Sequence, residues 1–451
     1  MKTTTLTVTL PLLCLPWLAA CTTSMLPAPA DTDSGSLKRT NASELQDYLA
    51  QAYSNPQPVA YAAPAPAAAP KAMAAGNYNS PAFSTTNLQE RGVDEADLIK
   101  TDGRHIYAIG APNNQSYQNN SLRIMQINAG GKNLQEVKRL TLPEGSNLQN
   151  LYLAGKQRRL VALGDTYQPM PMPMPMAARR PPGMPYFMPM PQQTELRYID
   201  VRQPEQASTS LHVKLDGSLN ASRRVGDTLY LVMQSYPNLD TNGWQPRPAS
   251  PEATAQQTRQ MLEKLNVQDF LPSYRTADGK SAPLVKAEDC YIQRQQPAAS
   301  PENYRYQGNS IVSVVAVDLN SPGFNFKSRC YVGNAETLYA SPQALYLATT
   351  DYQYNQAQGA RTNTNIHKFA FSGADIAYRG SGSVPGHLSG QEASFRFSEQ
   401  DGYLRVITDN DTFTDPSMAI AVPYGKSPAI LSILKEGGKD GLQQVAQLPN
   451  R

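Results

Sequence analysis

The chain has 451 residues, with 40 basic and 37 acidic side chains and a formal net charge of +3 at pH 7. Because these charges nearly balance, the chain lacks the strongly basic character of nucleic-acid-binding proteins, and no nucleic-acid partner is expected. Its four histidines form no H-E-x-x-H pair and no G-x-S-x-G elbow is present, so these hydrolase signatures are excluded as well.

Residues 1–20 are predicted to be a cleavable secretory signal peptide. Lys2 supplies the positive start, and the apolar segment 6–18 is too short to span a bilayer. Leu18-Ala19-Ala20-Cys21 resembles the processing site of bacterial lipoproteins, in which the Cys21 thiol receives a diacylglyceryl group. Lipidated Cys21 would anchor the exported chain to a membrane of the cell envelope, and Thr22 in place of Asp favours the outer membrane of a two-membrane cell. The alternative is an ordinary cleaved signal with an unmodified cysteine.

Residues 21–81 are predicted to be a disordered tether, because they are rich in Ala, Pro and Asn. One amphipathic stretch at 43–53 predicts a short helix within it. Ser43 could cap this helix, and the spacing of Leu45, Tyr48 and Leu49 places all three on one side. We expect this side to dock on the domain that follows.

Two cysteines remain once Cys14 leaves with the signal and Cys21 is lipidated. They are Cys290 and Cys330. Exported compartments are oxidising, so the pair is expected to form a disulfide that closes a loop of about 40 residues. Two free thiols are the alternative, because the sequence alone does not bring the cysteines together.

Residues 82–451 repeat a pattern in which a polar turn precedes a short apolar strand. Two further strands follow in each unit, and a fourth strand with small polar residues, as at 221–223 and 340–342, ends it. Five units are recognisable, and the last is incomplete. This pattern predicts an all-β fold, a β-propeller of four-stranded blades, with a β-sandwich or two stacked all-β domains as the alternative. The apolar strands that open the units lie at 102–109, 160–163, 229–232, 345–348 and 404–407.

Insertions of variable length separate the first two strands of each unit. The longest cover residues 164–194 and 234–310. Because they fall at the same point of every unit, we expect them on one face of the propeller.

The segment 85–103, TTNLQERGVDEADLIKTDG, closely resembles the leading motif of a family of secreted bacterial proteins whose β-propeller is distantly related to WD40 repeats. The resemblance implies a propeller fold and an extracytoplasmic location, and it brings no activity or catalytic residues with it. Family members continue with further strands, whereas this sequence stops at Arg451, one strand short of finishing its fifth unit. Ring folds commonly close when the N-terminal segment completes the last blade, so the strand at 88–100 is a candidate for closing the ring. The alternative is a fragment of a larger ring with open edges. The similarity covers the chain from residue 84 onward, most clearly at 219–231, 338–341, 365–369, 384–386 and 401–406.

A carboxylate cluster lies within this motif. Ca²⁺ takes six to eight oxygen ligands, so these acids are candidate calcium ligands. The alternative is that they accept hydrogen bonds from the backbone or from arginines at a blade turn. The four acids are Asp94, Glu95, Asp97 and Asp102.

Methionines alternate with prolines in the first long insertion. Thioether sulfurs select Cu(I), and an extended chain would present them in series, which predicts a copper site. The alternative is an adaptable loop that packs on a partner. The candidate ligands are Met170, Met172, Met174 and Met176.

These features together predict a non-enzymatic, membrane-anchored propeller that binds a protein or an envelope polymer through its loops. One alternative is an exported hydrolase or cofactor-dependent enzyme that uses the central channel of the propeller. Another is a copper-binding envelope protein that uses the methionine-rich loop. No cofactor other than these candidate ions is expected.

Overall fold

The computed structural model describes residues 35–54, 88–111, 119–166, 193–236, 256, 260, 264, 266–294, 303–305, 310–355, 359–388, 393–409, 429–437 and 441–449. The predicted signal peptide, Cys21 and the four candidate copper ligands lie outside these residues. Strands dominate the described part of the chain, which confirms the all-β prediction. Within that part, no helix is both long and apolar enough to cross a membrane.

Twenty of the strands form five antiparallel four-stranded blades, numbered 1 to 5 in chain order; blades 4 and 5 are also joined by one parallel bridge between Ser381 and Gly441. Blade 1 contains β3 (Ile99–Thr101), β4 (His105–Gly110), β5 (Ser121–Asn128) and β6 (Asn133–Thr141). Blade 2 contains β7 (Ser146–Ala154), β8 (Arg159–Thr166), β9 (Gln193–Asp200) and β10 (Ser208–Asp216). Blade 3 contains β11 (Ser218–Val225), β12 (Thr228–Ser235), β17 (Ile311–Asp318) and β18 (Phe326–Val332). Blade 4 contains β19 (Thr337–Ala340), β20 (Ala344–Asn355), β21 (Gly359–Ser372) and β22 (Asp375–Pro385). Blade 5 contains β23 (Phe397–Gln400), β24 (Tyr403–Asp409), β25 (Ala429–Gly437) and β26 (Gly441–Leu448).

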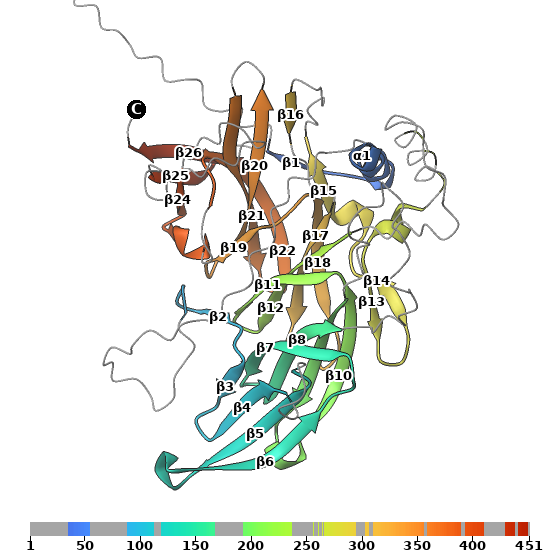
Figure 1. Ribbon diagram of the computed structural model, residues 1–451, viewed down its shortest axis with the longest axis vertical. Helices are drawn as coiled ribbons and strands as arrows, with labels where there is room; N and C mark the ends of the chain where they lie inside the picture. The colour runs from blue at the N-terminus through green and yellow to red at the C-terminus, as the bar shows by residue number, and fades with distance from the viewer. Residues whose placement is uncertain are drawn as a thin grey trace, which may run out of the picture.

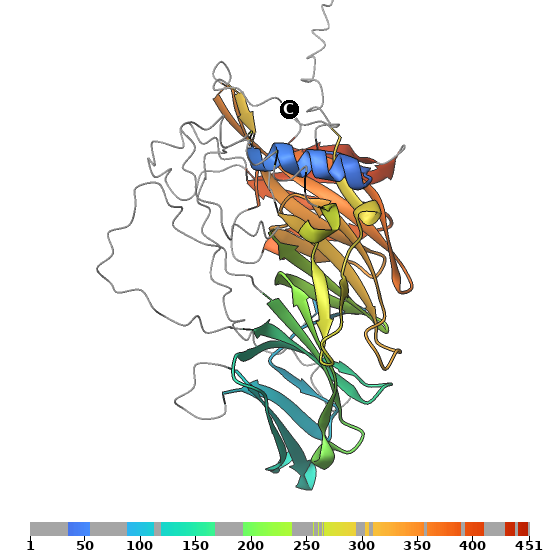
Figure 2. The same ribbon diagram turned by 90° about the vertical axis from the view of Figure 1, so that its right-hand side faces the viewer.

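The blades stack face to face in the order of the sequence. Residues 160–163, 229–233 and 344–348 are buried throughout, because the second strand of an inner blade is covered on both faces. A separate apolar cluster joins each consecutive pair of blades. Figure 1 shows the stack running from blade 1 at the lower end to blade 5 at the upper left, and Figure 2 shows the same order from the side. None of the clusters formed by described residues joins blade 5 to blade 1.

The boundary between units differs from the prediction by one strand. The small polar strand at 221–223 belongs to β11, which pairs with the strand that follows it rather than ending the preceding unit. The reason is local, since two residues between β11 and β12 make a tight hairpin. Likewise, Ala340 of the polar segment at 340–342 belongs to β19, which pairs with the following strand β20. Blade 5 therefore has four paired strands, not the incomplete set that the sequence predicts.

The long insertions follow the apolar strands at 160–163 and 229–232 and leave from one end of the blades, as expected. Because each blade begins one strand earlier than predicted, they lie between its second and third strands rather than between its first and second. The insertion at 234–310 also adds strands to three blades. Its strands β13 (Ser273–Thr276) and β14 (Ser281–Pro283) extend blade 2, β15 (Cys290–Gln293) runs parallel to β18 of blade 3, and β16 (Asn303–Arg305) pairs with β20.

The N-terminal residues 35–54 form an arm that docks on blade 3, hereafter the docked arm. Its strand β1 (Leu37–Arg39) pairs with β15, and its helix α1 (Ala42–Ser54) packs on the 3₁₀ turn η3 (Val267–Phe270). Figures 1 and 2 show α1, in blue, beside this layer. The prediction of a continuous disordered tether at 21–81 does not hold for these residues, because an apolar helix face finds an apolar surface to cover.

The helix predicted at 43–53 is confirmed as α1, with Leu45, Tyr48 and Leu49 buried. The predicted cap is wrong. Asn41, not Ser43, precedes the helix, and its Oδ1 accepts a hydrogen bond from the Glu44 amide at 3.0 Å. Asn is as good an N-cap residue as Ser, so the helix begins one residue before the predicted cap.

Replacing Leu45 with alanine is expected to lower the free energy of unfolding by about 3 kcal/mol, because a fully buried leucine leaves a cavity that the arm can only partly close. Denaturant unfolding of the purified protein measures the loss. Leu134→Ala is the matched control, since Leu134 is 57% exposed on β6 and its truncation should have little effect. Equal losses in the two variants would contradict the docking of the arm.

Candidate functional site

The segment at residues 88–101, hereafter the leading segment, contacts all five blades. Beside blade 5, Gln89 Nε2 donates a hydrogen bond to the Ser394 carbonyl at 2.6 Å. At blade 4, Glu90 Oε1 accepts a hydrogen bond from the Tyr339 hydroxyl at 2.6 Å. These contacts with blades 4 and 5 are made by side chains.

Backbone pairing then carries the leading segment past the other three blades. Strand β2 (Val93–Glu95) pairs with β11 of blade 3, Asp97 forms a bridge with Leu151 of blade 2, and β3 opens blade 1. The sequence predicts that a strand at 88–100 closes the ring by completing the last blade. That prediction is wrong, because the backbone of this segment pairs with the first strands of blades 2 and 3 and with β4.

Two of the four candidate calcium ligands form ion pairs. Asp94 lies between two cations, with Lys100 Nζ 3.0 Å from Oδ1 and Arg224 Nε 3.1 Å from Oδ2. Glu95 Oε1 lies 3.5 Å from Arg223 Nε. The buried Lys100 ammonium also donates to the Glu95 carbonyl at 2.6 Å. The side chains of the leading segment are thereby fixed to blade 3.

The other two candidate ligands organise turns. Asp97 Oδ1 accepts a hydrogen bond from the Leu98 amide at 2.7 Å. Asp102 Oδ1 accepts hydrogen bonds from the amides of Arg104 and His105, and Oδ2 accepts one from the Tyr107 hydroxyl at 3.0 Å. Partial burial raises the pKa of Asp102, but these hydrogen bonds outweigh it and hold the pKa below its usual value.

The structure does not bring the four acids into one ligand set. Across the described ranges, no three His, Cys, Asp or Glu side chains converge as a metal-binding group. The partners correspond to the alternative that the sequence left open, in which backbone amides and arginines engage the acids. Arg223 and Arg224 were not identified from the sequence, because they lie about 130 residues along the chain from the acids they meet.

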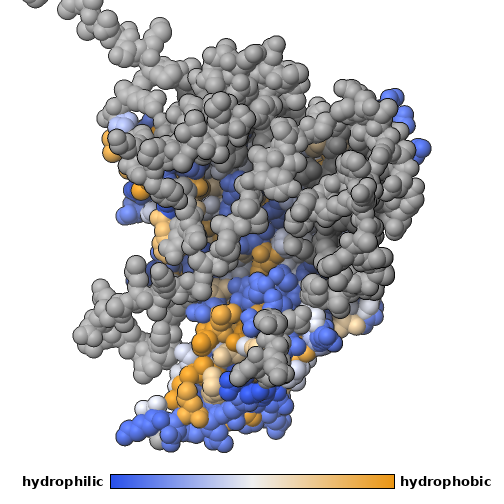
Figure 3. Space-filling view, viewed as in Figure 1, coloured by the Kyte–Doolittle hydropathy of each residue, from blue (hydrophilic) through white to orange (hydrophobic). Residues whose placement is uncertain are grey.

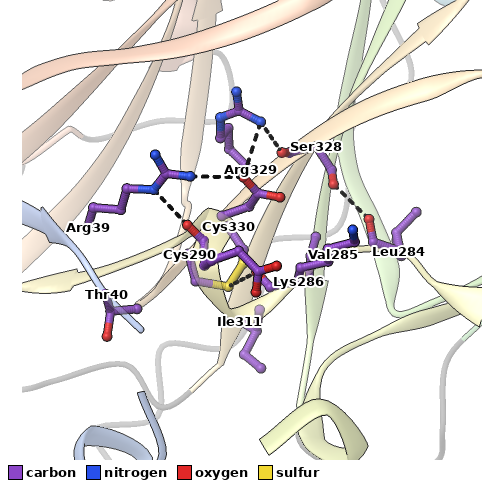
Figure 4. Close-up of a disulfide and its surroundings, with 12 residues drawn as sticks. Arg39, Thr40, Leu284, Val285, Lys286, Cys290, Ile311, Ser328, Arg329 and Cys330 are labelled. Carbon is purple, nitrogen blue, oxygen red and sulfur yellow. Dashed lines mark hydrogen bonds and ion pairs between the residues drawn. A yellow bond between two sulfur atoms is a disulfide. The ribbon is translucent and has the colours of Figure 1, made fainter. Parts of the chain in front are cut away.

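The disulfide between Cys290 and Cys330 is present, as predicted, and joins β15 to β18 with a Cα–Cα distance of 4.3 Å. Figure 4 shows it between the docked arm and blade 3. Arg39 of the arm donates a hydrogen bond to the Glu288 carbonyl at 2.7 Å, and both Arg39 and Arg329 lie near the Asp289 carboxylate. The disulfide and these contacts fasten the arm to the propeller.

A buried charged cluster on blade 2 was missed by the sequence analysis. Glu195 is fully buried, and its Oε2 lies 2.8 Å from Arg197 NH2, 3.2 Å from His212 Nε2 and 3.2 Å from Ser146 Oγ. Residues i and i+2 of a strand share a face, so a Glu and an Arg at this spacing on one strand are a signal that could have been found. Because Arg197 already holds the carboxylate, the cluster is an ion pair and not a free base beside a hydroxyl.

Burial by itself raises the pKa of Glu195, but His212 and Arg197 outweigh it and leave the pKa below its usual value. The pair therefore stabilises the fold above the unfolded-state pKa of about 4.5, and this contribution is lost as the pH falls through the lower, folded-state pKa. Glu195→Gln is expected to cost about 3 kcal/mol at neutral pH, because it leaves Arg197 buried without a counter-charge.

The measurement is denaturant unfolding of wild type and Glu195→Gln from neutral pH down to about pH 3. The difference between the two proteins should shrink once the pH falls below about 4.5. Glu136→Gln is the control, since Glu136 pairs with Arg123 and Arg139 at the surface of blade 1. A difference that is independent of pH would contradict the assignment.

Stacked four-stranded antiparallel sheets, each packed on the next, define this chain as a β-propeller protein. It belongs to the family described as "Beta propeller domain", whose model matches residues 83–450. No curated protein matches the chain.

Three solved structures show distant similarity to the chain. An acylaminoacyl peptidase of Pyrococcus horikoshii is 11% identical, with a TM-score of 0.24, over 78% of this chain and 45% of that one. Its uncomplexed form gives 10% identity and a TM-score of 0.22, over 76% of this chain and 50% of that one. Hydrazine synthase of Kuenenia stuttgartiensis is 10% identical, with a TM-score of 0.20, over 80% of each chain. The chain thus spans half or less of the length of the two peptidase chains.

Proposed function

We propose that this protein is an exported lipoprotein, anchored through Cys21, that holds its propeller near an envelope membrane as a non-enzymatic binding scaffold. The docked arm is the observation that carries the proposal. Because the arm is fixed to blade 3, fourteen residue steps lead from Cys21 to Gly35. Fully extended, they reach about 50 Å, whereas a free tether to residue 81 would reach about 200 Å.

The arrangement of the insertions supports binding as the role. The gaps between second and third strands open at the same end of all five blades. Loops gathered on one face of a rigid scaffold are a common way to build a binding surface. Asp94 and Glu95 of the leading segment are already paired with Lys100, Arg223 and Arg224, which favours a structural use of this segment. The proposed partner is a protein or an envelope polymer.

Radiolabelled palmitate incorporation tests the anchor. The wild-type chain should be labelled and should fractionate with membranes, whereas Cys21→Ser should be unlabelled. Cys14→Ser is the matched control, because Cys14 lies in the segment that is removed, and it should behave as wild type. Equal labelling of wild type and Cys21→Ser, or no labelling of either, would overturn the anchor.

Co-sedimentation of the purified protein with isolated peptidoglycan or with envelope proteins tests the scaffold. Wild type should bind, and a variant lacking residues 167–192 or 237–250 should bind more weakly. A reproducible turnover that is abolished by a single substitution in the first strand of a blade would overturn the non-enzymatic role instead.

A further inference from the structure

The docked arm is joined to a buried histidine of blade 4 through two hydroxyl groups. The Leu37 amide donates a hydrogen bond to the Tyr378 hydroxyl at 3.2 Å. That hydroxyl lies 2.7 Å from Ser381 Oγ, which in turn lies 2.5 Å from His367 Nδ1. A chain of hydrogen bonds that runs in one direction from the Leu37 amide ends on Nδ1 as an acceptor, which requires the neutral imidazole. The arm and the histidine therefore belong to one polar network.

His367 is also buried beneath the docked arm. It is 4% exposed and packs on Tyr331 of blade 3, with the two ring centroids 5.0 Å apart. His367 lines a small cavity, and Leu37 of the arm lines the same cavity. The arm fits closely here, because a Cβ atom at Gly35 would come within 2.8 Å of Asn365 Oδ1. Undocking of the arm would therefore open the cavity, and with it the imidazole, to water.

Burial of the ring disfavours its charged form. An imidazole that takes up a proton away from water gains a charge without the hydration that stabilises it, so burial lowers the pKa of a histidine. Burial holds the pKa of His367 at about 4, whereas an exposed histidine titrates near 6.5.

The other titratable groups around the imidazole do not account for a loss of docking in mild acid. The lining residues from the arm and from β15 are uncharged, and Asp351 of β20 is the charged side chain of the lining. Tyr331 and Tyr378 stay neutral in acid. Glu336 accepts hydrogen bonds from the amide and hydroxyl of Thr350, and burial raises its pKa. A raised carboxyl pKa stabilises the folded form as the pH falls, which is the opposite sign.

We propose that protonation of His367 releases the docked arm, which makes the arm an acid-sensitive strap across blades 3 and 4. The docked form holds the neutral imidazole, whereas undocking exposes the ring and lets it take up a proton. Because the docked form binds fewer protons, docking weakens as the pH falls below about 6.5. With a pKa of about 4 in the docked form, the undocking equilibrium should rise about 20-fold between neutral pH and about pH 5.

Release of the docked arm would also free a longer tether between the propeller and the membrane. This consequence rests on the proposed function, because it requires the anchor at Cys21. The release itself does not depend on lipidation, so it can be measured on the purified protein without a membrane.

Hydrogen exchange of the purified protein between neutral pH and about pH 5 tests the release. After correction for the intrinsic pH dependence of amide exchange, residues 35–54 should lose about 20-fold in protection, while blades 1 and 5 keep theirs. Unchanged protection of residues 35–54 would overturn the proposal. An equal loss in the blades would overturn it too, because the whole fold and not the arm would then be opening.

Three variants locate the effect at His367. His367→Asn keeps an oxygen acceptor near the position of Nδ1 but does not titrate, so protection of the arm should no longer depend on pH. His105→Asn is the matched control and should behave as wild type. His105 belongs to β4 of blade 1, which forms the lower end of the molecule, away from the arm (Figure 1, Figure 3).

Tyr378→Phe tests the network even if His367→Asn does not fold. It keeps His367 but removes the acceptor of the Leu37 amide, so this amide should lose protection at neutral pH, and the further loss in acid should remain. Full protection of the Leu37 amide in Tyr378→Phe would overturn the proposal. A fall in arm protection in His367→Asn as large as that in wild type would overturn it as well.

Discussion

Replacing both Cys290 and Cys330 with alanine is expected to lower the free energy of unfolding by about 4 kcal/mol. The bond spans 40 residues, and opening it returns the loop-closure entropy of that segment to the unfolded chain. Denaturant unfolding of the oxidised wild type and of the double variant measures the difference.

The same change should loosen the docked arm before the rest of the fold. Strand β15 is held to β18 of blade 3 by the disulfide and by a two-residue parallel pairing, and it carries β1 on its other edge. Without the disulfide, residues 35–54 should lose hydrogen-exchange protection while blades 1 and 5 keep theirs. Reductant should destabilise wild type but leave the double variant unchanged. Equal stability of oxidised and reduced wild type would contradict the assignment.

Lys368→Met is expected to cost about 3–5 kcal/mol, because it removes the cation from a buried cluster at the seam between blades 4 and 5. Lys368 Nζ lies 3.3 Å from Glu399 Oε1 and 3.4 Å from Glu436 Oε2, and the Lys368 and Glu399 side chains are only 9% and 6% exposed. Without Lys368, the charge of Glu399 remains buried and loses its principal counter-charge. Denaturant unfolding at neutral pH measures the loss.

The matched control is Lys280→Met. Lys280 Nζ lies 2.8 Å from Asp278, but the lysine side chain is 85% exposed, so solvent replaces its partner and stability should hardly change. The double variant Lys368→Met with Glu399→Gln should recover part of the loss, because both charges leave together. If the losses in free energy of unfolding caused by Lys368→Met and by Glu399→Gln simply add in the double variant, the buried pair is not the cause.

The leading segment carries both the family resemblance and the contacts that connect the blades. Gln89 and Glu90 reach blades 5 and 4, β2 pairs with blade 3, and Asp97 meets blade 2. Two of the acids that suggested a calcium site in the sequence, Asp94 and Glu95, hold this segment in place through Lys100, Arg223 and Arg224. An acidic motif can thus be a structural element when its counter-charges come from another blade.

The sequence by itself determined the elements of this protein. Apolar strands at 160–163 or 229–232 and the turns between them are local patterns, so the five units and the all-β fold could be predicted. The spacing of Leu45, Tyr48 and Leu49 is local too, and it predicted α1. The disulfide followed from the small number of cysteines in an oxidising compartment.

Only the tertiary structure decided which partners these elements have. Asp94 pairs with Arg224 about 130 residues later, and Leu37, Gln293 and Asn365 enclose one cavity although the chain separates them widely. The physical reason is that the spacing of apolar residues, which predicts a strand or a helix, involves residues only a few positions apart in the sequence. Ion pairs and cavities instead depend on how whole blades stack, and the stacking order brings remote polar groups together without a repeating signal in the sequence.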